Sequence, residues 1–201
     1  MLDVQLPVIL EYMCTSHQRI SADFQKEHPP LYHFKKTLVC DVYRDDVFLQ
    51  YVSAYLDFCR AYALSFDESS PDCISRSRVK HINSVQQKLE TYLQKENGKI
   101  PISKCLNDLF GARYICSSTV TLPHVEEILA RHSYALKCMD SSKNGYKGIH
   151  IYFNVSNTAF QWELQIWNQA DSAGNVESHK FYKQDYSKWE PEQKGGCLEW
   201  L

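Results

Sequence analysis

The sequence predicts a protein of the mixed α/β or α+β class, in which helices pack against a β-sheet. Apolar residues recur at helical spacing through the first half of the chain, a pattern typical of amphipathic helices. From residue 111 onward, short apolar or alternating runs bounded by turn formers are typical of strands. Helices followed by the order strand-helix-strand-strand-strand-helix are expected to form one sheet covered by helices.

These patterns predict the elements in order. Helices are expected at residues 3–18, 41–66, 84–95 and 102–110, with a connector at about residues 16–37 that contains Pro29 and Pro30. Asn97 and Gly98 stop the third helix, and Gly111 ends the fourth. Strands are expected at residues 112–117, 134–139, 149–155 and 160–167, and further helices at residues 121–132 and 174–189. We divide the chain into an N-terminal helical region, residues 1–74, and a core, residues 75–201.

Composition narrows the class of protein. The chain has 201 residues, 44% of them hydrophobic, and a formal net charge of −2, as expected of an ordinary globular protein without a broad basic surface for nucleic acid, so any basic surface is expected to be local. No apolar run is long enough to span a bilayer, and the N-terminus lacks the basic start of a signal peptide. The eight cysteines include no CxxC pair, so neither a zinc site nor a disulfide framework is indicated. We therefore expect a cytoplasmic protein with neither membrane nor DNA as a partner.

Three basic residues in and before the third predicted helix suit a polyphosphate ligand. Arg78 and Lys80 point the same way if their stretch is extended, and Lys88 follows on the helix. Arginine supplies a planar fork and lysine a point charge, so together they can hold phosphates from several directions. A solvated basic surface explains the same residues.

Asp108 lies where a predicted helix gives way to a strand, and Arg113 starts that strand. A carboxylate at such a turn can hold Mg²⁺, which takes oxygen ligands partly from protein and partly from substrate phosphate. A helix C-cap or a surface ion pair is the alternative.

Asn144 and Gly145 predict a turn that leaves the ring of Tyr146 free to stack on a ligand. Lys143, Lys147 and His150 would add charge around it. A hairpin with a structural tyrosine is the alternative interpretation.

Glu163 and Gln165 share one face of the last predicted strand, while Trp162, Leu164 and Ile166 share the other. An acid beside an amide suits a contact with a metal or a hydroxyl group. A strand with one solvated face explains the pair equally well.

In their order and spacing, these stretches resemble the synthetase domain of the RelA/SpoT family, whose single-domain small alarmone synthetases are of similar size. The resemblance covers about half of the chain and rests on five motifs: Arg78-Val-Lys80 with Ser84 and Lys88; Asp108 with Gly111 and Arg113; Lys143-Asn-Gly-Tyr146 with His150; Glu163-Leu-Gln165; and His179 with Tyr182 and Lys183.

The resemblance implies a nucleotidyltransferase-like mixed sheet flanked by helices, with the N-terminal helices as an extension. It also implies an enzyme that transfers the β,γ-pyrophosphate of ATP to a 3′-hydroxyl and releases AMP. Asp108 and Glu163 would be catalytic and hold Mg²⁺, and Tyr146 would stack on the acceptor base. The ATP phosphates would contact Arg78, Lys80, Lys88 and Arg113, and the acceptor would contact Lys143, Asn144, His150 and Gln165.

Three positions on the acceptor side depart from the family pattern. No proline precedes Lys143, Gly148 replaces the usual serine, and Trp167-Asn168 replaces the usual Arg-Thr, which removes a cation. The eighteen residues after Lys183 are also too few for the paired C-terminal helices through which familiar alarmone synthetases tetramerise.

Members of this family differ in their acceptor. Housekeeping enzymes use GDP or GTP to make (p)ppGpp, whereas a toxic branch paired with antitoxins modifies the 3′-terminal adenosine of tRNA. The altered acceptor side favours tRNA, and an antitoxin protein is then an expected partner. In the predicted connector, Lys35 and Lys36 accompany Tyr32 and Phe34 in a segment not expected to bury them, which suits tRNA phosphates, although an ordinary solvated loop would look the same.

Two other functions stay open at this point. The chain could be a (p)ppGpp synthetase that uses GDP or GTP, or a catalytically silent module that only binds nucleotides. Both Asp108 and Glu163 are present, which speaks against the silent module because a pure binder does not need two metal-binding carboxylates in register.

Overall fold

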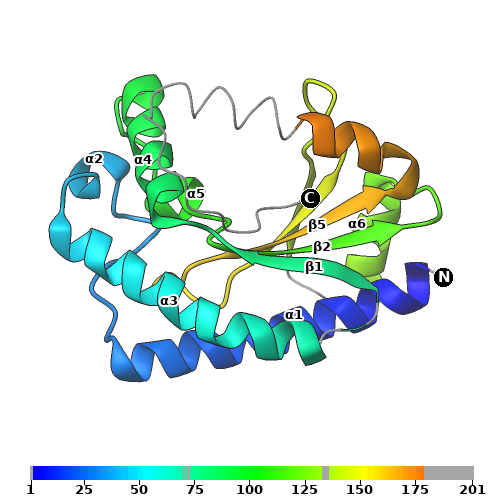
Figure 1. Cartoon of the computed structure of the whole chain (residues 1–201), viewed down its shortest axis with the longest axis horizontal. Coiled ribbons are helices and arrows are strands. Elements are labelled where there is room, and N and C mark those ends of the chain that lie inside the picture. The colour runs from blue at the N-terminus through cyan, green and yellow to red at the C-terminus, as the bar shows by residue number, and fades with distance from the viewer. Residues whose placement is uncertain (1, 70, 72, 133–135, 179–201) are drawn as a thin grey trace, which may run out of the picture.

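The computed structural model describes residues 2–69, 71, 73–132 and 136–178, and it shows a five-stranded sheet with helices on both sides (Figure 1). The helices are α1 (Leu2–Glu27), α2 (Val39–Val42), α3 (Asp46–Ser69), α4 (Ile82–Glu96), α5 (Ile102–Cys105) and α6 (Leu122–Arg131), with a 3₁₀ turn at Gln169–Asp171. The strands are β1 (Ile74–Val79), β2 (Phe110–Cys116), β3 (Lys137–Asp140), β4 (Ile149–Phe153) and β5 (Trp162–Asn168).

The sheet is mixed, in the order β1-β2-β5-β4-β3. The central pair, β2 and β5, is parallel, with Phe110 opposite Trp162 and Arg113 opposite Gln165. The outer pairs are antiparallel. The expectation of a mixed α/β sheet flanked by helices is confirmed.

The long helices α1 and α3 lie along one face of the sheet, and α6 continues this layer beside β3 (Figure 1). The indole of Trp162 on β5 is fully buried under them, stacks on Phe110 and donates a hydrogen bond of 2.8 Å to Tyr55 of α3. Residues of the N-terminal helices and of the sheet belong to one hydrophobic core. The predicted boundary between the N-terminal region and the core, at residues 74 and 75, stays a prediction.

The N-terminal helix is longer than the sequence pattern predicts. The expected connector at residues 16–37 is wrong for its first part, because α1 continues to Glu27. Ile20 and Phe24 extend the buried face of Met13 and His17 by helical spacing. Packing of this face against the core therefore stabilises the helix almost as far as the two prolines.

The single helix expected at residues 41–66 is two helices. The chain breaks between α2 and α3, where Oδ1 of Asp45 accepts hydrogen bonds from the backbone N–H groups of Val47 and Phe48 at 2.9 and 3.3 Å. The carboxylate of Asp45 thus caps α3. The other Asp45 oxygen accepts the Tyr32 hydroxyl at 2.8 Å.

Two further differences lie in the middle of the chain. The predicted helix at residues 102–110 is wrong beyond α5, since β2 already begins at Phe110. The strand β1 was not predicted as a separate element, because its sequence is largely polar and only Ile74 is buried. Helix α4 ends where the sequence predicts, with Asn97 in the left-handed conformation at φ 50°.

The predicted helix at residues 121–132 and the predicted strands at 149–155 and 160–167 agree with α6, β4 and β5. The described part of the strand predicted at residues 134–139 overlaps β3. Residues 172–178 are helical, and the rest of the helix expected at residues 174–189 lies outside the described residues. The described helices include none that is both long and apolar enough to cross a membrane.

Candidate active site

Three cations surround one carboxylate where β1 ends and β2 begins. Asp108 Oδ2 lies 2.5 Å from Lys80 Nζ, and Asp108 Oδ1 lies 2.9 Å from Lys88 Nζ. Arg78 Nη2 is 3.6 Å from Oδ2. The antiparallel pairing of β1 with β2 brings Arg78 and Lys80 to this carboxylate, and α4 brings Lys88. We call these four residues the cationic cluster.

The cationic cluster carries excess positive charge in a largely buried place. Burial alone would raise the pKa of Asp108, but Lys88, Lys80 and Arg78 together hold this pKa well below its usual range. Burial, helped by the charges of Lys88 and Arg78, lowers the pKa of Lys80 despite the attraction of Asp108. Three cations against one carboxylate leave a local field that favours a polyphosphate.

A row of hydrogen-bonded polar side chains crosses β2, β5 and β4 on the face away from α1 and α3. Arg113 Nη2 donates to Gln165 Oε1 at 3.2 Å, and Gln165 Nε2 donates to Glu163 Oε2 at 2.9 Å. Glu163 Oε1 is 2.8 Å from His150 Nδ1. Glu163 and Gln165 do share a face of β5, as predicted, but each is only 5% exposed, so this face is not solvated.

Burial and close partners decide the charges in this row. Burial alone would raise the pKa of Glu163, but the hydrogen bond and the attraction of His150 lower it overall. Burial lowers the pKa of Arg113 to about 9, which still leaves the guanidinium charged at neutral pH. Glu163 and Arg113 therefore present opposite charges on neighbouring strands.

Tyr146, His150 and Trp167 form an aromatic cluster at the other end of this row. The Tyr146 hydroxyl oxygen is 2.6 Å from His150 Nε2 and accepts a hydrogen bond of 2.9 Å from Trp167 Nε1. The rings of His150 and Trp167 meet the tyrosine ring at 78° and 75°, so neither lies parallel to it. The expectation of a freely exposed Tyr146 is wrong, because its hydroxyl points into the protein and only part of the ring is open. Burial raises the pKa of this tyrosine to about 12.

The aromatic cluster is connected to the row of polar side chains through Arg113. Its Cζ atom lies 3.3 Å from the centre of the Trp167 ring, a cation–π contact at stacking distance. Trp167 is 1% exposed, and the cation below it is shared with Gln165.

Asn144 and Gly145 form the predicted turn, and it is the two-residue hairpin of the alternative interpretation, flanked by Lys143 and Tyr146. Lys143 and Tyr146 exchange two backbone hydrogen bonds of 2.9 and 3.0 Å, and Asn144 and Gly145 have φ values of 50° and 87°. Both central residues of this turn are in the left-handed region that Asn and Gly tolerate. The side chains of Lys143 and Asn144 are exposed on the same loop that carries Tyr146.

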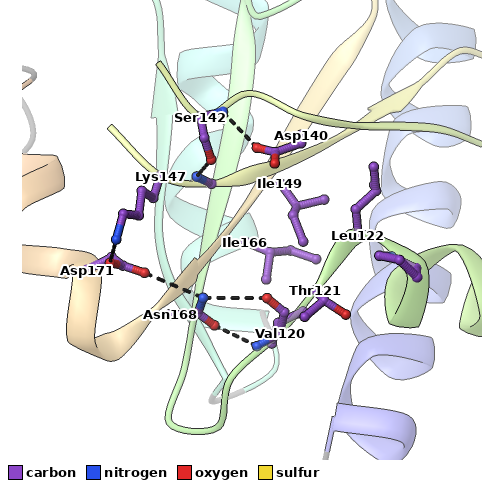
Figure 2. A pocket seen from close by; sticks show the side chains of 12 residues that line it. Val120, Thr121, Leu122, Asp140, Ser142, Lys147, Ile149, Ile166, Asn168 and Asp171 are labelled. Carbon is purple, nitrogen blue, oxygen red and sulfur yellow. Dashed lines mark hydrogen bonds and ion pairs between the residues drawn. The ribbon is translucent and has the colours of Figure 1, made fainter. Parts of the chain in front are cut away.

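A cavity of about 340 Å³ lies behind this loop, between β4, β5 and the start of α6 (Figure 2). Polar side chains of its lining already have partners: Lys147 Nζ contacts Asp171 Oδ1 at 3.0 Å, and Asn168 Oδ1 accepts the backbone N–H of Val120 at 2.7 Å. Lys147, expected beside Tyr146, thus points toward Asp171 instead. The Lys147 contact links the loop to the 3₁₀ turn that follows β5.

The basic connector is only partly as expected. Lys35 and Lys36 are exposed, but Phe34 is 2% exposed and Tyr32 packs on Phe48, so the aromatic residues belong to the core. The backbone of this turn is fixed by hydrogen bonds from Phe34 N to Asn157 O and from Ser103 N to Phe34 O, at 2.8 and 3.0 Å.

His179 and Lys183, the last predicted motif, lie outside the described residues. Glu163 and Gln165 lie between the two clusters: the strand register puts Arg78 opposite Gly111 and Gly111 opposite Glu163, and Glu163 contacts His150 beside Tyr146.

A comparison with models of protein families shows to which family the chain belongs. Residues 77–187, more than half of the chain, match the model of the region found in RelA/SpoT proteins. The chain belongs to the RelA/SpoT family. Its matched region is a RelA/SpoT-type pyrophosphokinase domain, which holds both clusters and the residues between them.

Solved structures similar to this RelA/SpoT protein include small alarmone synthetases from Bacillus subtilis. Synthetase 2 is 22% identical over 72% of this chain and 81% of that chain, with a TM-score of 0.37. Synthetase 1 bound to its product pppGpp is 20% identical over 71% and 78%, with a TM-score of 0.36. Synthetase 1 bound to AMPCPP is 19% identical over 69% and 76%, with a TM-score of 0.32. A comparison with curated protein sequences gave no match.

Asn175 is a residue of this RelA/SpoT domain that sequence reasoning missed. It is fully buried, and its side-chain amide contacts the backbone N–H and C=O of Lys147 at 2.7 Å each. This pair of hydrogen bonds holds the loop that carries Tyr146 and Gly148. A single asparagine in a helical stretch gives no sequence pattern from which this contact could be predicted.

The carboxylates of the RelA/SpoT site fit a magnesium ion that arrives with a nucleotide. Among the described residues, no three His, Cys, Asp or Glu side chains form a group able to hold a metal by themselves. Asp108 already attracts cations to both of its oxygens, and Mg²⁺ commonly takes one or two protein carboxylates together with substrate phosphates and water.

Proposed function

We propose that this RelA/SpoT protein transfers the β,γ-pyrophosphate of ATP to the 3′-hydroxyl of the terminal adenosine of tRNA and releases AMP. The observation that carries the proposal is the meeting of three cations at Asp108, in line with a buried carboxylate and a tyrosine at the other end of the same sheet face. Pyrophosphoryl transfer needs positioned cations for the donor phosphates and a defined place for the acceptor.

The cationic cluster supplies the donor side in this proposal. Arg78, Lys80 and Lys88 turn from Asp108 to the ATP phosphates, because a triphosphate offers them more negative charge than one carboxylate. Arg113 contributes a fourth cation from β2. Binding and charge neutralisation are thus provided by side chains fixed on two strands and one helix, which lowers the cost of ordering them.

Asp108 and Glu163 are the proposed catalytic carboxylates and magnesium ligands. When bound, Mg²⁺ supplies further neutralisation of the phosphate charge. Glu163 is held by His150 and Gln165 at both oxygens, so its orientation is fixed before substrate binds. In the proposed reaction, Glu163 accepts a hydrogen bond from the attacking hydroxyl.

The acceptor side favours a nucleoside that carries little charge. Tyr146 offers its ring to the acceptor base, with Lys143, Asn144, His150 and Gln165 around it. Trp167 stands where the family pattern has a cation, and its ring covers the guanidinium of Arg113. A guanosine di- or triphosphate needs cations for its own phosphates, whereas the 3′-terminal adenosine of tRNA does not. Exposed Lys35 and Lys36 are proposed to contact the tRNA backbone.

The setting follows from the proposed substrate. Charged and uncharged tRNA and ATP are found together in the cytoplasm, so we propose that compartment. Modification of tRNA ends stops translation, so we also propose an antitoxin protein as the partner that keeps this activity in check.

The experiment that tests the proposal offers several acceptors side by side. Purified protein is incubated with ATP labelled at the γ-phosphate and with deacylated tRNA, GDP, GTP or ATP, and both labelled product and AMP are measured. Label on tRNA, lost in Glu163→Gln and Asp108→Ala, is the expected result. Label on GDP or GTP alone would make this a (p)ppGpp synthetase, and nucleotide binding without any transfer would make it a silent module.

A further inference from the structure

We infer that Trp167 and Gly148 are positioning residues for the acceptor, which together hold the Tyr146 ring at one fixed angle beside the sheet. The inference rests on the proposed function, because it assigns both residues to the acceptor contact of that site. Neither residue is proposed to touch a reacting atom. Their effect on the reaction passes through Tyr146.

The indole of Trp167 holds the tyrosine by its hydroxyl group. An indole N–H can only donate, so the 2.9 Å contact fixes the Tyr146 oxygen as its acceptor. The indole is itself immobilised, because it is 1% exposed and lies against the Arg113 guanidinium. The hydroxyl therefore has one defined position relative to β5.

Gly148 leaves the space that this hydroxyl occupies. A Cβ atom added at position 148 would lie 2.6 Å from the Tyr146 oxygen and 3.1 Å from Trp167 Cδ1. The first distance is far shorter than atoms tolerate, and the hydroxyl cannot give way without losing Trp167. The two departures from the family pattern, a glycine for a serine and a tryptophan for an arginine, are thus neighbours that depend on each other.

The backbone that carries Tyr146 is also held. Its hairpin turn is closed by two hydrogen bonds, and Asn175 fixes the next residue, Lys147, from the other side. With the loop and the hydroxyl both fixed, the tyrosine ring is ordered before the acceptor arrives. Preorganisation of this kind improves acceptor binding, because no conformational entropy of the tyrosine ring is lost when the acceptor binds.

The same strand offers a matched comparison. Trp162 on the opposite face of β5 also donates its indole N–H to a tyrosine, Tyr55, at 2.8 Å. Trp162→Phe removes the same kind of hydrogen bond from the core, away from the acceptor. Trp167→Phe keeps an aromatic ring over Arg113 but removes the N–H donor. Each variant thus loses one indole–tyrosine hydrogen bond, but the tyrosine is Tyr55 of the core in one case and Tyr146 of the acceptor loop in the other.

Steady-state kinetics of these variants test the inference. Trp167→Phe is expected to raise the acceptor KM about fivefold, the effect of one neutral hydrogen bond, while the ATP KM stays within about twofold of wild type. Trp162→Phe is expected to lower the melting temperature and leave both KM values unchanged. Tyr146→Phe should raise the acceptor KM at least as much as Trp167→Phe, because it also removes the contact with His150 Nε2. The double variant should be no worse than Tyr146→Phe alone, because both lack the bond to Trp167.

The Gly148→Ala variant tests the second positioning residue independently of Trp167. It is expected to raise the acceptor KM more than Trp167→Phe does, because it displaces the ring rather than one bond. Adding Tyr146→Phe removes the atom that the new methyl group meets first, so the double variant should recover part of the lost affinity. Gly174→Ala is the control, since a Cβ at that position meets nothing within 4 Å.

A spectroscopic readout separates this inference from the proposed function. In protein with isotopically labelled tyrosine rings, the Tyr146 signal is identified by its loss in Tyr146→Phe. It is expected to shift in Trp167→Phe and Gly148→Ala, and to stay unchanged in Trp162→Phe and Gly174→Ala. An unmoved signal, or equal KM effects of Trp167→Phe and Trp162→Phe, would overturn the inference. Absence of transfer to every acceptor, with the signal shifted as expected, would overturn the proposed function alone.

Discussion

At the scale of single residues, the site depends on side chains whose neighbours decide what they can do. Asp108 is distant in sequence from Arg78, Lys80 and Lys88, so their types and spacing predict a phosphate or metal site but not that they all touch one carboxylate. Tyr146 was expected to be exposed because it follows a turn. The structure differs because Trp167 and Gly148 provide a bond and a space that a pattern of turn residues does not contain.

Removal of the Asp108 charge is predicted to make the protein depend on an added anion. Asp108→Asn leaves three cations without their shared carboxylate, and breaking a largely buried ion pair in this way costs about 3 kcal/mol of unfolding free energy. Inorganic pyrophosphate should then raise the melting temperature of Asp108→Asn more than that of wild type, because it replaces the missing charge. Thermal unfolding with and without pyrophosphate measures this.

The control for this experiment is Asp57→Asn, which removes an exposed carboxylate paired only locally with Arg60. It should respond to pyrophosphate as wild type does. Equal shifts in Asp108→Asn and wild type would show that the cationic cluster does not bind the anion.

At the scale of helices and strands, the sequence predicts elements best where one periodic face is buried. The amphipathic pattern predicts α4, α6, β4 and β5, and it fails where other contacts decide. In α1 the buried face of Ile20 and Phe24 continues through a stretch of polar residues, and β1 is held to the sheet by its pairing with β2 rather than by apolar side chains. The break between α2 and α3 depends on one capping side chain.

Loss of that cap is predicted to destabilise the fold. Asp45→Ala removes two hydrogen bonds to the first turn of α3 and the partner of the Tyr32 hydroxyl. The expected cost is about 1–2 kcal/mol, measured by chemical denaturation. Asp46→Ala changes the neighbouring, exposed carboxylate within the same turn and should cost clearly less. If both cost the same, the cap would not explain why α3 begins where it does.

The buried histidine of α1 predicts a loss of stability in mild acid. His17 is fully buried, its Nε2 contacts the Phe160 carbonyl at 2.8 Å, and burial lowers its pKa to about 4. Its ordinary pKa of about 6.5 applies in the unfolded chain, so between pH 6.5 and 4 the unfolded state binds the proton and the folded state does not. The contribution of His17 is thus complete above about pH 6.5, and about 3 kcal/mol is lost as the pH falls toward 4.

Denaturation curves from pH 7 to pH 4 measure this effect. In His17→Phe, which keeps an aromatic ring against Trp162, the decline in this window should be clearly smaller. His132→Gln, at an exposed position at the end of α6, should decline as wild type does. An identical decline in His17→Phe would remove His17 as the cause.

At the scale of the whole molecule, the sheet order places the two clusters at opposite ends of one surface. The sequence predicts strands and a helix-covered sheet, but the order β1-β2-β5-β4-β3 does not follow from local patterns. This order puts the cations of β1 and β2 beside Glu163 and Gln165 of β5, and His150 of β4 next to them. The residues from the family motifs therefore meet only in the folded sheet.

The turn with Lys35 and Lys36 is predicted to distinguish a large acceptor from a small one. Lys35→Glu with Lys36→Glu should reduce transfer to tRNA at least tenfold at moderate salt, because phosphate contacts dominate such binding. ATP-dependent use of a free nucleotide should stay unchanged. The measurement is the rate of labelled product with tRNA and with GDP in parallel. Lys95→Glu with Lys99→Glu, also exposed, makes the same change of charge elsewhere and serves as the control. Equal loss with both acceptors would remove this turn from tRNA binding.

The parallel pairing of β2 with β5 has a consequence for the way the protein becomes active. Its partners, such as Phe110 and Trp162, are far apart in the chain, so this pair closes a long loop whose entropy must be overcome before the sheet is complete. Glu163, Gln165 and Trp167 all lie on β5; Gln165 and Trp167 contact Arg113 of β2 through this pairing, and Glu163 contacts His150 of β4 on the other side. Until β5 has been made and has docked between β2 and β4, the acceptor side therefore lacks Gln165 and Trp167. Recovery of transfer during refolding therefore reports the docking of β5, not the formation of the helices.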